Sequence, residues 1–216
     1  MKADIQVLVH SAIRLAVKSP AKVIYFDPYG LNTAPHDADI IFSTHDHYDH
    51  LSPADIARVA GKDTVLVVPS SCRAKAEETG LKVITVDAGT KTEVCGVSFE
   101  AVPSYNVGKK FHPKENGWLG YIVEADGERI WVAGDTDINC DTMQVKCDVA
   151  LVPAGGTYTT TAAEAAALVN TIRPKTAIPT HYQYETGTLE DGECFRSLVD
   201  KSIEVVLQIG PRKKEG

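Results

Sequence analysis

The sequence has no hydrophobic run long enough to cross a membrane. None of its apolar stretches approaches the roughly 20 residues that span a bilayer. The first residues, Met1-Lys2-Ala3-Asp4, lead into a strand-like stretch that lacks the long hydrophobic region and the cleavage site of a signal peptide. We therefore expect a cytoplasmic protein without a membrane partner.

An excess of positive charge is also missing. The 216 residues include 22 Lys and Arg against 29 Asp and Glu, which gives a formal net charge of -7. A nucleic-acid surface needs a basic stripe that offsets the phosphate charge. The composition therefore argues against a nucleic-acid partner and against an enzyme that processes nucleic acids.

Paired cysteines and a serine nucleophile motif are absent as well. The five cysteines are odd in number and lack the close pairs of a zinc knuckle, so we expect reduced thiols. A contact between Cys140 and Cys147 is the one alternative. No Gly-x-Ser-x-Gly elbow occurs, which argues against a serine hydrolase.

Short β-branched runs bounded by Gly, Pro, Asp or Asn recur along the chain and predict strands. Asp126-Gly127 between two of them predicts a hairpin turn. The expected strands are Ile5–Val9, Lys22–Phe26, Asp39–Ser43, Thr64–Val68, Lys82–Val86, Thr92–Ala101, Trp118–Ala125, Arg129–Ala133, Val149–Val152, Thr176–Pro179 and Ile203–Ile209.

Helix signals are fewer but clear. Ser52-Pro53 supplies an N-cap and a first-turn proline, and Thr161 to Glu164 forms a capping box before an alanine-rich run. Two further helices are expected over Ser71–Thr79 and Leu189–Val199. Many strands with four helices predict two sheets packed face to face with helices outside, in one domain over residues 1–216. The halves on either side of about residue 90 are candidate structural counterparts.

One six-residue segment concentrates metal-ligand side chains directly after a predicted strand. His45 and His47 share a face in extended backbone, and Asp49 and His50 add an oxygen and a nitrogen. Imidazole and carboxylate together suit borderline divalent ions. We call this segment the hexad, His45-Asp46-His47-Tyr48-Asp49-His50.

Two later strand ends carry further ligand types. Asp135 follows an apolar strand and Gly134, and His181 follows another apolar run. Strand ends at one edge of a sheet converge, so these side chains are expected to meet the hexad. A catalytic metal also needs an open position for water.

These motifs resemble the metallo-β-lactamase superfamily, and the resemblance covers nearly the whole chain. It rests on His-x-His-x-Asp-His, then Gly-Asp-Thr, then a late Pro-x-His. The branch it resembles is that of small hydrolases related to ascorbate-6-phosphate lactonase. The resemblance implies a four-layer αββα sandwich. It also implies one metal ion on His45 and His47, a second on Asp49, His50 and His181, and Asp135 as a bridge.

One departure concerns the third ligand of the first metal. Many relatives place a histidine in a Pro-Gly-His-Thr segment, whereas this chain reads Pro103-Ser104-Tyr105-Asn106 there. We expect His112 to replace it, because no other histidine lies between the hexad and Asp135. The alternative is a loop histidine that lines the pocket.

Other candidates would support the ligands or contact substrate. Asp27 is expected to brace the hexad, since ligating histidines usually have such a partner. Tyr105 and Tyr182 are candidate donors to an oxyanion, and Lys109 and Lys110 could attract an anion. The remaining candidates at the pocket edge are His10, Asn106 and Asp137.

The resulting hypothesis is a hydrolase with two divalent ions, zinc first and Mn, Fe or Ni as alternatives. It would use a metal-activated water on a small lactone, ester or phosphodiester, with Asp49 or Asp135 accepting the water proton. An iron redox enzyme and a non-catalytic binding protein on the same fold are the rival hypotheses, and a homo-oligomer stays open.

Overall fold

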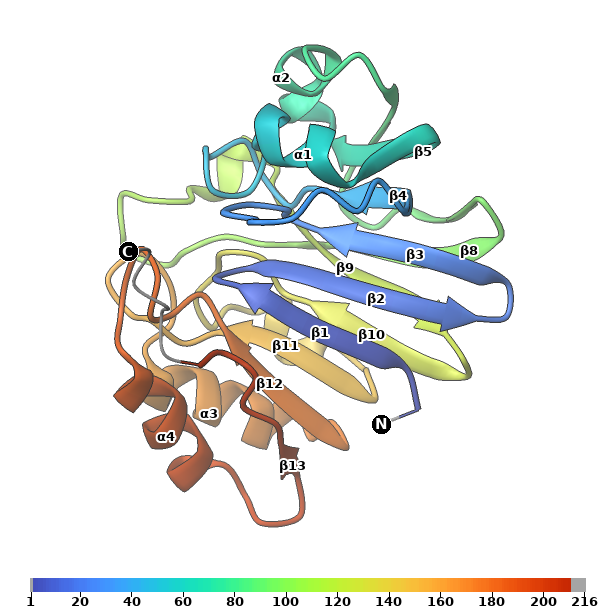
Figure 1. The fold of residues 1–216 in the computed structure, drawn as a ribbon. Coiled ribbons are helices and arrows are strands. Elements are labelled where there is room, and N and C mark those ends of the chain that lie inside the picture. The colour runs from blue at the N-terminus through green and yellow to red at the C-terminus, as the bar shows by residue number, and fades with distance from the viewer. Residues whose placement is uncertain (1, 211–216) are drawn as a thin grey trace, which may run out of the picture.

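Two mixed β-sheets pack against each other with helices on their outer faces in the computed structural model, which describes residues 2–210 (Figure 1). The first sheet has the order β1-β2-β3-β4-β5-β6. Its strands are β1 (Asp4–Val9), β2 (Ala12–Lys18), β3 (Ala21–Phe26), β4 (Ala38–Phe42), β5 (Ala60–Pro69) and β6 (Lys82–Val86).

The second sheet has the order β13-β12-β11-β10-β9-β8-β7. Its strands are β7 (Lys91–Val94), β8 (Val97–Pro103), β9 (Leu119–Ala125), β10 (Glu128–Val132), β11 (Val149–Pro153), β12 (Thr176–Thr180) and β13 (Glu204–Val205). In both sheets an antiparallel meander comes first and parallel strands follow. Each half of the chain on either side of residue 90 therefore forms one sheet, as the sequence suggested.

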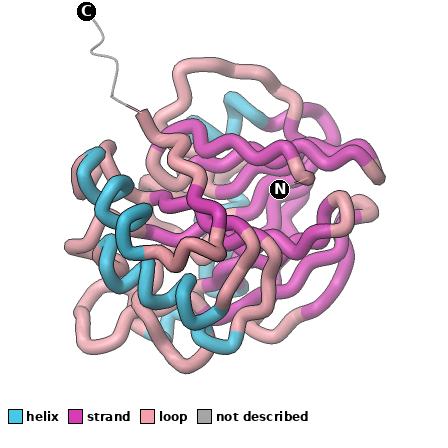
Figure 2. The backbone as a smooth tube through the Cα atoms, turned by 90° about the horizontal axis from the view of Figure 1, so that it is seen from below, coloured by secondary structure: helices cyan, strands magenta, loops and turns pink. Residues whose placement is uncertain are grey.

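Four described α-helices cover the outer faces of the sheets. They are α1 (Pro53–Val59), α2 (Arg73–Glu77), α3 (Ala162–Ile172) and α4 (Leu189–Leu198). The Oγ of Ser52 caps α1, and the capping box of Thr161 and Glu164 begins α3, both as predicted. In Figure 2 the main helical segments lie outside the strands. None of the described helices is long and apolar enough to span a bilayer.

Three apolar cores follow from these four layers. The largest lies between the two sheets and includes Phe26, Phe42 and Tyr121. A second core lies between the second sheet and the helices α3 and α4, and a third lies under α1 and α2. β11 and β12 are buried along their whole length, because both faces of this parallel region are covered.

The structure differs from the expected elements at three places. The run Thr92–Ala101 is a hairpin rather than one strand, because Cys95 and Gly96 both adopt left-handed backbone conformations, which suit a two-residue turn. β2 was not predicted. Of the expected strand Ile203–Ile209 only β13 forms. All five cysteines are free.

Candidate metal centre

The predicted ligand side chains meet at one end of the sandwich. The hexad follows β4, Asp135 follows β10 and His181 follows β12. His10 follows β1, and its carbonyl accepts a hydrogen bond from the backbone N–H of His181 at 3.1 Å. The carboxyl ends of parallel strands therefore bring together groups that are far apart in sequence, which is where α/β sheets generally place ligands.

A first group consists of three histidines, His45, His47 and His112. Their ligand nitrogens lie within 4.8 Å of one another, and Nε2 of His45 is 3.0 Å from Nδ1 of His47. The indole ring of Trp118 packs on both His45 and His47 at 4.8 Å between centroids. The structure thus brings His112 to the two hexad histidines, with a buried tryptophan beside the group.

Asn106 orients the loop that carries His112. The backbone N–H of Asn106 donates to the carbonyl of His112 at 2.9 Å, and its side-chain amide lies 3.2 Å from Nδ1 of the same histidine. That amide also donates to the carbonyl of Tyr158 at 2.6 Å. His112 has a φ of 52°, so this residue is held in a left-handed conformation by its surroundings.

Asp137 anchors the same loop rather than facing the ligand groups. Its carboxylate accepts the backbone N–H of Val107 at 3.0 Å and the ammonium of Lys109 at 2.6 Å. Lys109 also donates to the carbonyl of Thr159 at 2.7 Å. Because its donors are engaged inside the protein, Lys109 does not offer the free cation that the sequence suggested for an anionic substrate.

A second group joins Asp49 and His50 with His181 and His10. Oδ2 of Asp49 lies 3.1 Å from Nε2 of His10, 3.6 Å from Nε2 of His50 and 3.9 Å from Nε2 of His181. The rings of His10 and His181 are 4.0 Å apart between centroids. All four side chains are buried, and His10 lies within this group.

Asp135 lies between the two groups. Its Oδ2 is 3.2 Å from Nε2 of His112 and 3.0 Å from Nε2 of His181. Its Oδ1 is 3.3 Å from Nε2 of His50, and Nε2 of His45 is 3.9 Å from Oδ2. One carboxylate therefore reaches histidines of both groups.

Asp27 fixes the hexad from behind. This fully buried carboxylate accepts hydrogen bonds of 2.8 Å from the backbone N–H and hydroxyl of Thr44 and from Nδ1 of His50. Gly134 has a φ of 67°, and a Cβ there would lie 2.9 Å from Cβ of Thr44. The loop before Asp135 can therefore approach the hexad only with glycine at this position.

Comparison with known proteins identifies the family. Residues 17–182 match the family model described as the β-lactamase superfamily domain. The chain belongs to this family. It is 34% identical over 181 residues to a UPF0173 metal-dependent hydrolase of Pyrococcus abyssi, a match that covers 81% of this chain and 80% of the relative.

Solved structures agree with this assignment. A protein described as a metal-dependent hydrolase from Parabacteroides distasonis matches with a TM-score of 0.78 and 28% identity, over 96% of this chain and 94% of that one. A metallo hydrolase from Ignicoccus hospitalis has the same fold, with a TM-score of 0.74 and 22% identity over 98% of this chain and 96% of that one. The chain is thus a metal-dependent hydrolase of the UPF0173 family, and the expected metallo-β-lactamase fold is confirmed.

The electrostatics of this UPF0173 hydrolase suit cation binding. Burial alone would raise the pKa of Asp135, but His181 and His50 outweigh burial and hold that pKa well below its usual range. Burial and the neighbouring His50 lower the pKa of His45 well below its ordinary value, so its imidazole is neutral at pH 7. An ionised carboxylate therefore lies beside a neutral imidazole, and both forms can bind a metal ion.

Several buried ligand atoms lack a hydrogen-bond partner in the described structure. They include Nε2 of His50, Nε2 of His112, Nε2 of His181 and Oδ1 of Asp135. Buried polar atoms are normally hydrogen-bonded, and leaving one unsatisfied costs about 1–3 kcal/mol. Nitrogen and oxygen donors clustered in this way fit one or two divalent cations. The His/Asp clusters are consistent with a dinuclear site.

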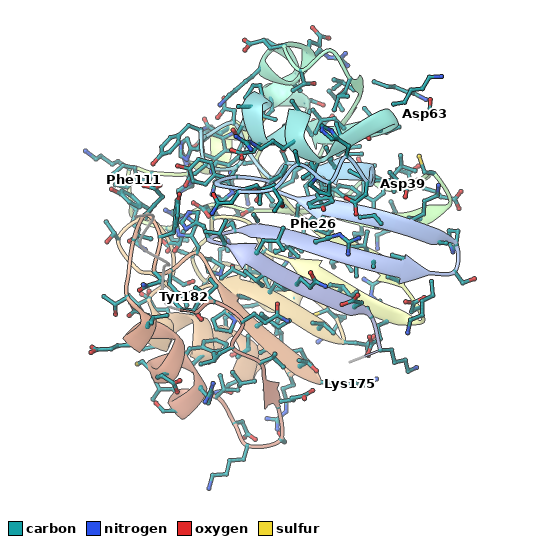
Figure 3. The ribbon with its side chains drawn as sticks, in the orientation of Figure 1. Phe26, Asp39, Asp63, Phe111, Lys175 and Tyr182 are labelled. Atoms are coloured by element: carbon teal, nitrogen blue, oxygen red, sulfur yellow. The ribbon has the colours of Figure 1, made fainter. Side chains whose placement is uncertain are left out.

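The two candidate oxyanion donors do not face the ligand groups. The hydroxyl of Tyr105 donates to Asp141 at 2.8 Å. Tyr182 packs into the core under α3 and α4 next to Gly192, and its hydroxyl has no hydrogen-bond partner among the described residues (Figure 3). The structure therefore gives no support for either tyrosine as an oxyanion donor.

Proposed function

We propose that the chain is a dinuclear hydrolase that directs a metal-activated water at a small substrate. Asp135 would bridge two divalent ions. The first ion would be held by His45, His47 and His112, and the second by Asp49, His50 and His181. The observation that carries the proposal is the position of Asp135, because its Oδ2 lies within 3.2 Å of nitrogens from both groups.

The chemistry follows from this arrangement. When bound, two divalent cations lower the pKa of a water to about 7 and polarise a carbonyl or phosphoryl oxygen. Asp49 and Asp135 are the carboxylates placed to accept the water proton. Asp27 keeps the proton of His50 on Nδ1, because a carboxylate accepts only from an N–H, and so leaves Nε2 free for a metal.

We propose zinc as the metal and a lactone, ester or phosphodiester as the substrate. Mixed imidazole and carboxylate donors suit zinc, although Mn, Fe and Ni accept similar sets. A lactonase-like activity is the substrate class that the sequence resemblance favours. The rival iron redox activity is disfavoured by His47, since di-iron relatives usually have an acidic residue there.

The proposal is tested by metal analysis combined with a hydrolysis screen. We expect two zinc ions per chain, and hydrolysis of at least one lactone, ester or phosphodiester that stops on chelation. Asp135→Asn should bind fewer than two ions, and its hydrolysis rate should fall at least about 100-fold, because the electrostatic stabilisation of the transition state is weakened.

Asp63→Asn is the matched control, because this exposed carboxylate lies at the opposite end of the sandwich from Phe111 (Figure 3). It should keep both metals and full activity. Hydrolysis that survives complete metal removal would refute the proposal. Coloured iron bands in the purified protein would instead favour the redox alternative.

A further inference from the structure

Three tyrosines from separate loops meet beside the second ligand group. Tyr29 follows β3, Tyr48 lies within the hexad, and Tyr184 follows β12. The ring of Tyr29 packs edge to face on Tyr48 at 5.7 Å and on Tyr184 at 5.9 Å between centroids. We call these three side chains the tyrosine wall.

The wall is a fixed feature of the fold. The hydroxyls of Tyr29 and Tyr48 both donate to the carboxylate of Glu185, at 2.9 and 3.3 Å. Gly30 has a φ of 65°, and a Cβ there would lie 3.3 Å from the ring of Tyr184. The loop after β3 thus needs a glycine to accommodate this ring.

The wall adjoins the metal centre. The ring of His10 is 6.4 Å from that of Tyr29 and 6.3 Å from that of Tyr184, between centroids. His10 in turn lies 3.1 Å from Asp49. Tyr48 stands between His47 and Asp49 in sequence, and its side chain is 62% exposed. A large aromatic ring is therefore presented to solvent immediately beside residues of both ligand groups.

A second aromatic pair flanks the first ligand group. Phe111, which directly precedes His112, packs edge to face on Tyr158 at 4.9 Å between centroids. Figure 3 shows Phe111 on the same end of the sandwich as the strand ends that carry the site. Aromatic side chains thus lie beside both groups, and aromatic faces bind flat apolar rings.

The charges near the wall disfavour an anionic substrate. Glu185 is exposed and places a carboxylate among the wall hydroxyls. Lys109 is engaged with Asp137 and a carbonyl, and Lys110 lies over the ring of Phe111 at 5.4 Å, beside the other group. A phosphodiester that reached the wall would meet this negative charge, whereas an uncharged ring would not.

We propose that the tyrosine wall binds a flat, uncharged ring of the substrate, so that the hydrolase selects aryl-bearing esters or lactones over phosphodiesters. This inference rests on the proposed function, because it takes the two ligand groups as the reacting centre. Within the wall, Tyr48 supplies the exposed ring. Glu185 positions Tyr29 and Tyr48 through their hydroxyls.

The test uses two metal-binding probes that share one head group. Benzohydroxamic acid and acetohydroxamic acid both chelate zinc, but the first carries a phenyl ring where the second carries a methyl group. Titration calorimetry on the zinc-loaded protein should show tighter binding of benzohydroxamic acid by about ten-fold, the size of one aromatic contact. Tyr48→Ala should abolish this preference without changing the zinc content, whereas Tyr48→Phe should keep it.

Leu198→Ala is the control, because Leu198 is also a large exposed apolar side chain but lies at the end of α4. It should keep the preference. In parallel, turnover of dihydrocoumarin and of bis(p-nitrophenyl) phosphate is measured on the same samples. Glu185→Gln should raise the rate on the phosphodiester relative to the lactone by about five-fold, the effect of one unit charge near 4 Å in water.

The outcomes separate the two proposals. Equal binding of the two hydroxamates, binding of neither, or an unchanged preference in Tyr48→Ala would overturn the role of the wall, even if the protein hydrolyses esters. A rate on the phosphodiester that exceeds that on the lactone would overturn the substrate selection. Absence of all turnover, with the phenyl preference intact, would instead refute the proposed function and leave the ring-binding site in place.

Discussion

Replacing Asp27 with asparagine should damage the metal centre while leaving the fold almost intact. The asparagine carbonyl would still accept the backbone N–H of Thr44, which fixes the orientation of the amide. The NH2 group would then face the Thr44 hydroxyl, which can rotate to accept it, and Nδ1 of His50, which cannot remain a donor. Nδ1 of His50 must therefore be unprotonated, and the remaining ring proton is held on Nε2, the nitrogen that faces Asp135.

The size of the Asp27→Asn effect differs between the metal-free and the metal-bound protein. Without metal, burial would lower the pKa of His50, but Asp135 and Asp27 outweigh burial and raise this pKa well above its ordinary value. The imidazole can therefore lose the Nδ1 proton and still donate from Nε2 to Asp135. Burial raises the pKa of Asp27, so the native carboxylate carries a desolvation cost that a neutral amide avoids. We expect the free energy of unfolding of the metal-free protein to change by less than about 2 kcal/mol. A bound metal requires an unprotonated Nε2 on His50, which the asparagine amide disfavours. The affinity of the second site for zinc should therefore fall about 10- to 100-fold.

The assay is competition for zinc with a chromophoric chelator, alongside urea unfolding of the metal-free protein. Glu128→Gln is the matched control. Glu128 is also a buried carboxylate that accepts backbone N–H groups, those of Lys2 and Ala3, but it is remote from the ligand groups. It should leave zinc affinity unchanged. An Asp27→Asn variant that binds zinc as tightly as the native protein would refute the tautomer argument.

Two further predictions concern the histidine loop and the turn before Asp135. His112→Ala should reduce the zinc content from two ions to one, as measured by elemental analysis. Alanine at the exposed His36 should leave the zinc content unchanged. Two ions in the His112 variant would show that the first group binds its ion without His112. Gly134→Ala would place a side chain at a left-handed φ, with its Cβ 2.9 Å from Cβ of Thr44. The free energy of unfolding, measured by urea titration, should therefore fall by about 2–4 kcal/mol. An unchanged urea midpoint would contradict the close approach of Gly134 to Thr44.

Several residues of the candidate metal centre could be predicted because they directly follow strands. The hexad, Asp135 and His181 each follow an apolar run, so their convergence could be inferred from sheet geometry alone. His112 could be anticipated only because a histidine was missing elsewhere, since its own segment shows no strand or helix pattern. Its position depends on long-range hydrogen bonds that the loop donates, from Asn106 to the carbonyl of Tyr158 and from Val107 to Asp137, which no local pattern encodes.

Other features could not be obtained from sequence for physical reasons. In β2 the buried residues Ile13, Leu15 and Val17 alternate with Arg14, Ala16 and Lys18, so no long apolar run marks the strand. A tight turn at His10-Ser11 precedes it. The hairpin at Cys95-Gly96 interrupts a run that is continuous in composition. Tyr29 and Tyr184 are brought together from opposite sheets, and neither belongs to a motif. Tyr182 adjoins His181, but its side chain faces the helix-covered core.

The backbone hydrogen bond between His181 and His10 has a consequence for how the enzyme is made. It joins the end of the first strand to the end of one of the last, and the second ligand group contains both side chains. On the ribosome the hexad emerges early, yet its partners at 135 and 181 appear only when most of the chain has been synthesised. The second ligand group is therefore complete only once residue 181 has been synthesised, and a product that ends before this residue lacks one of the group's histidines.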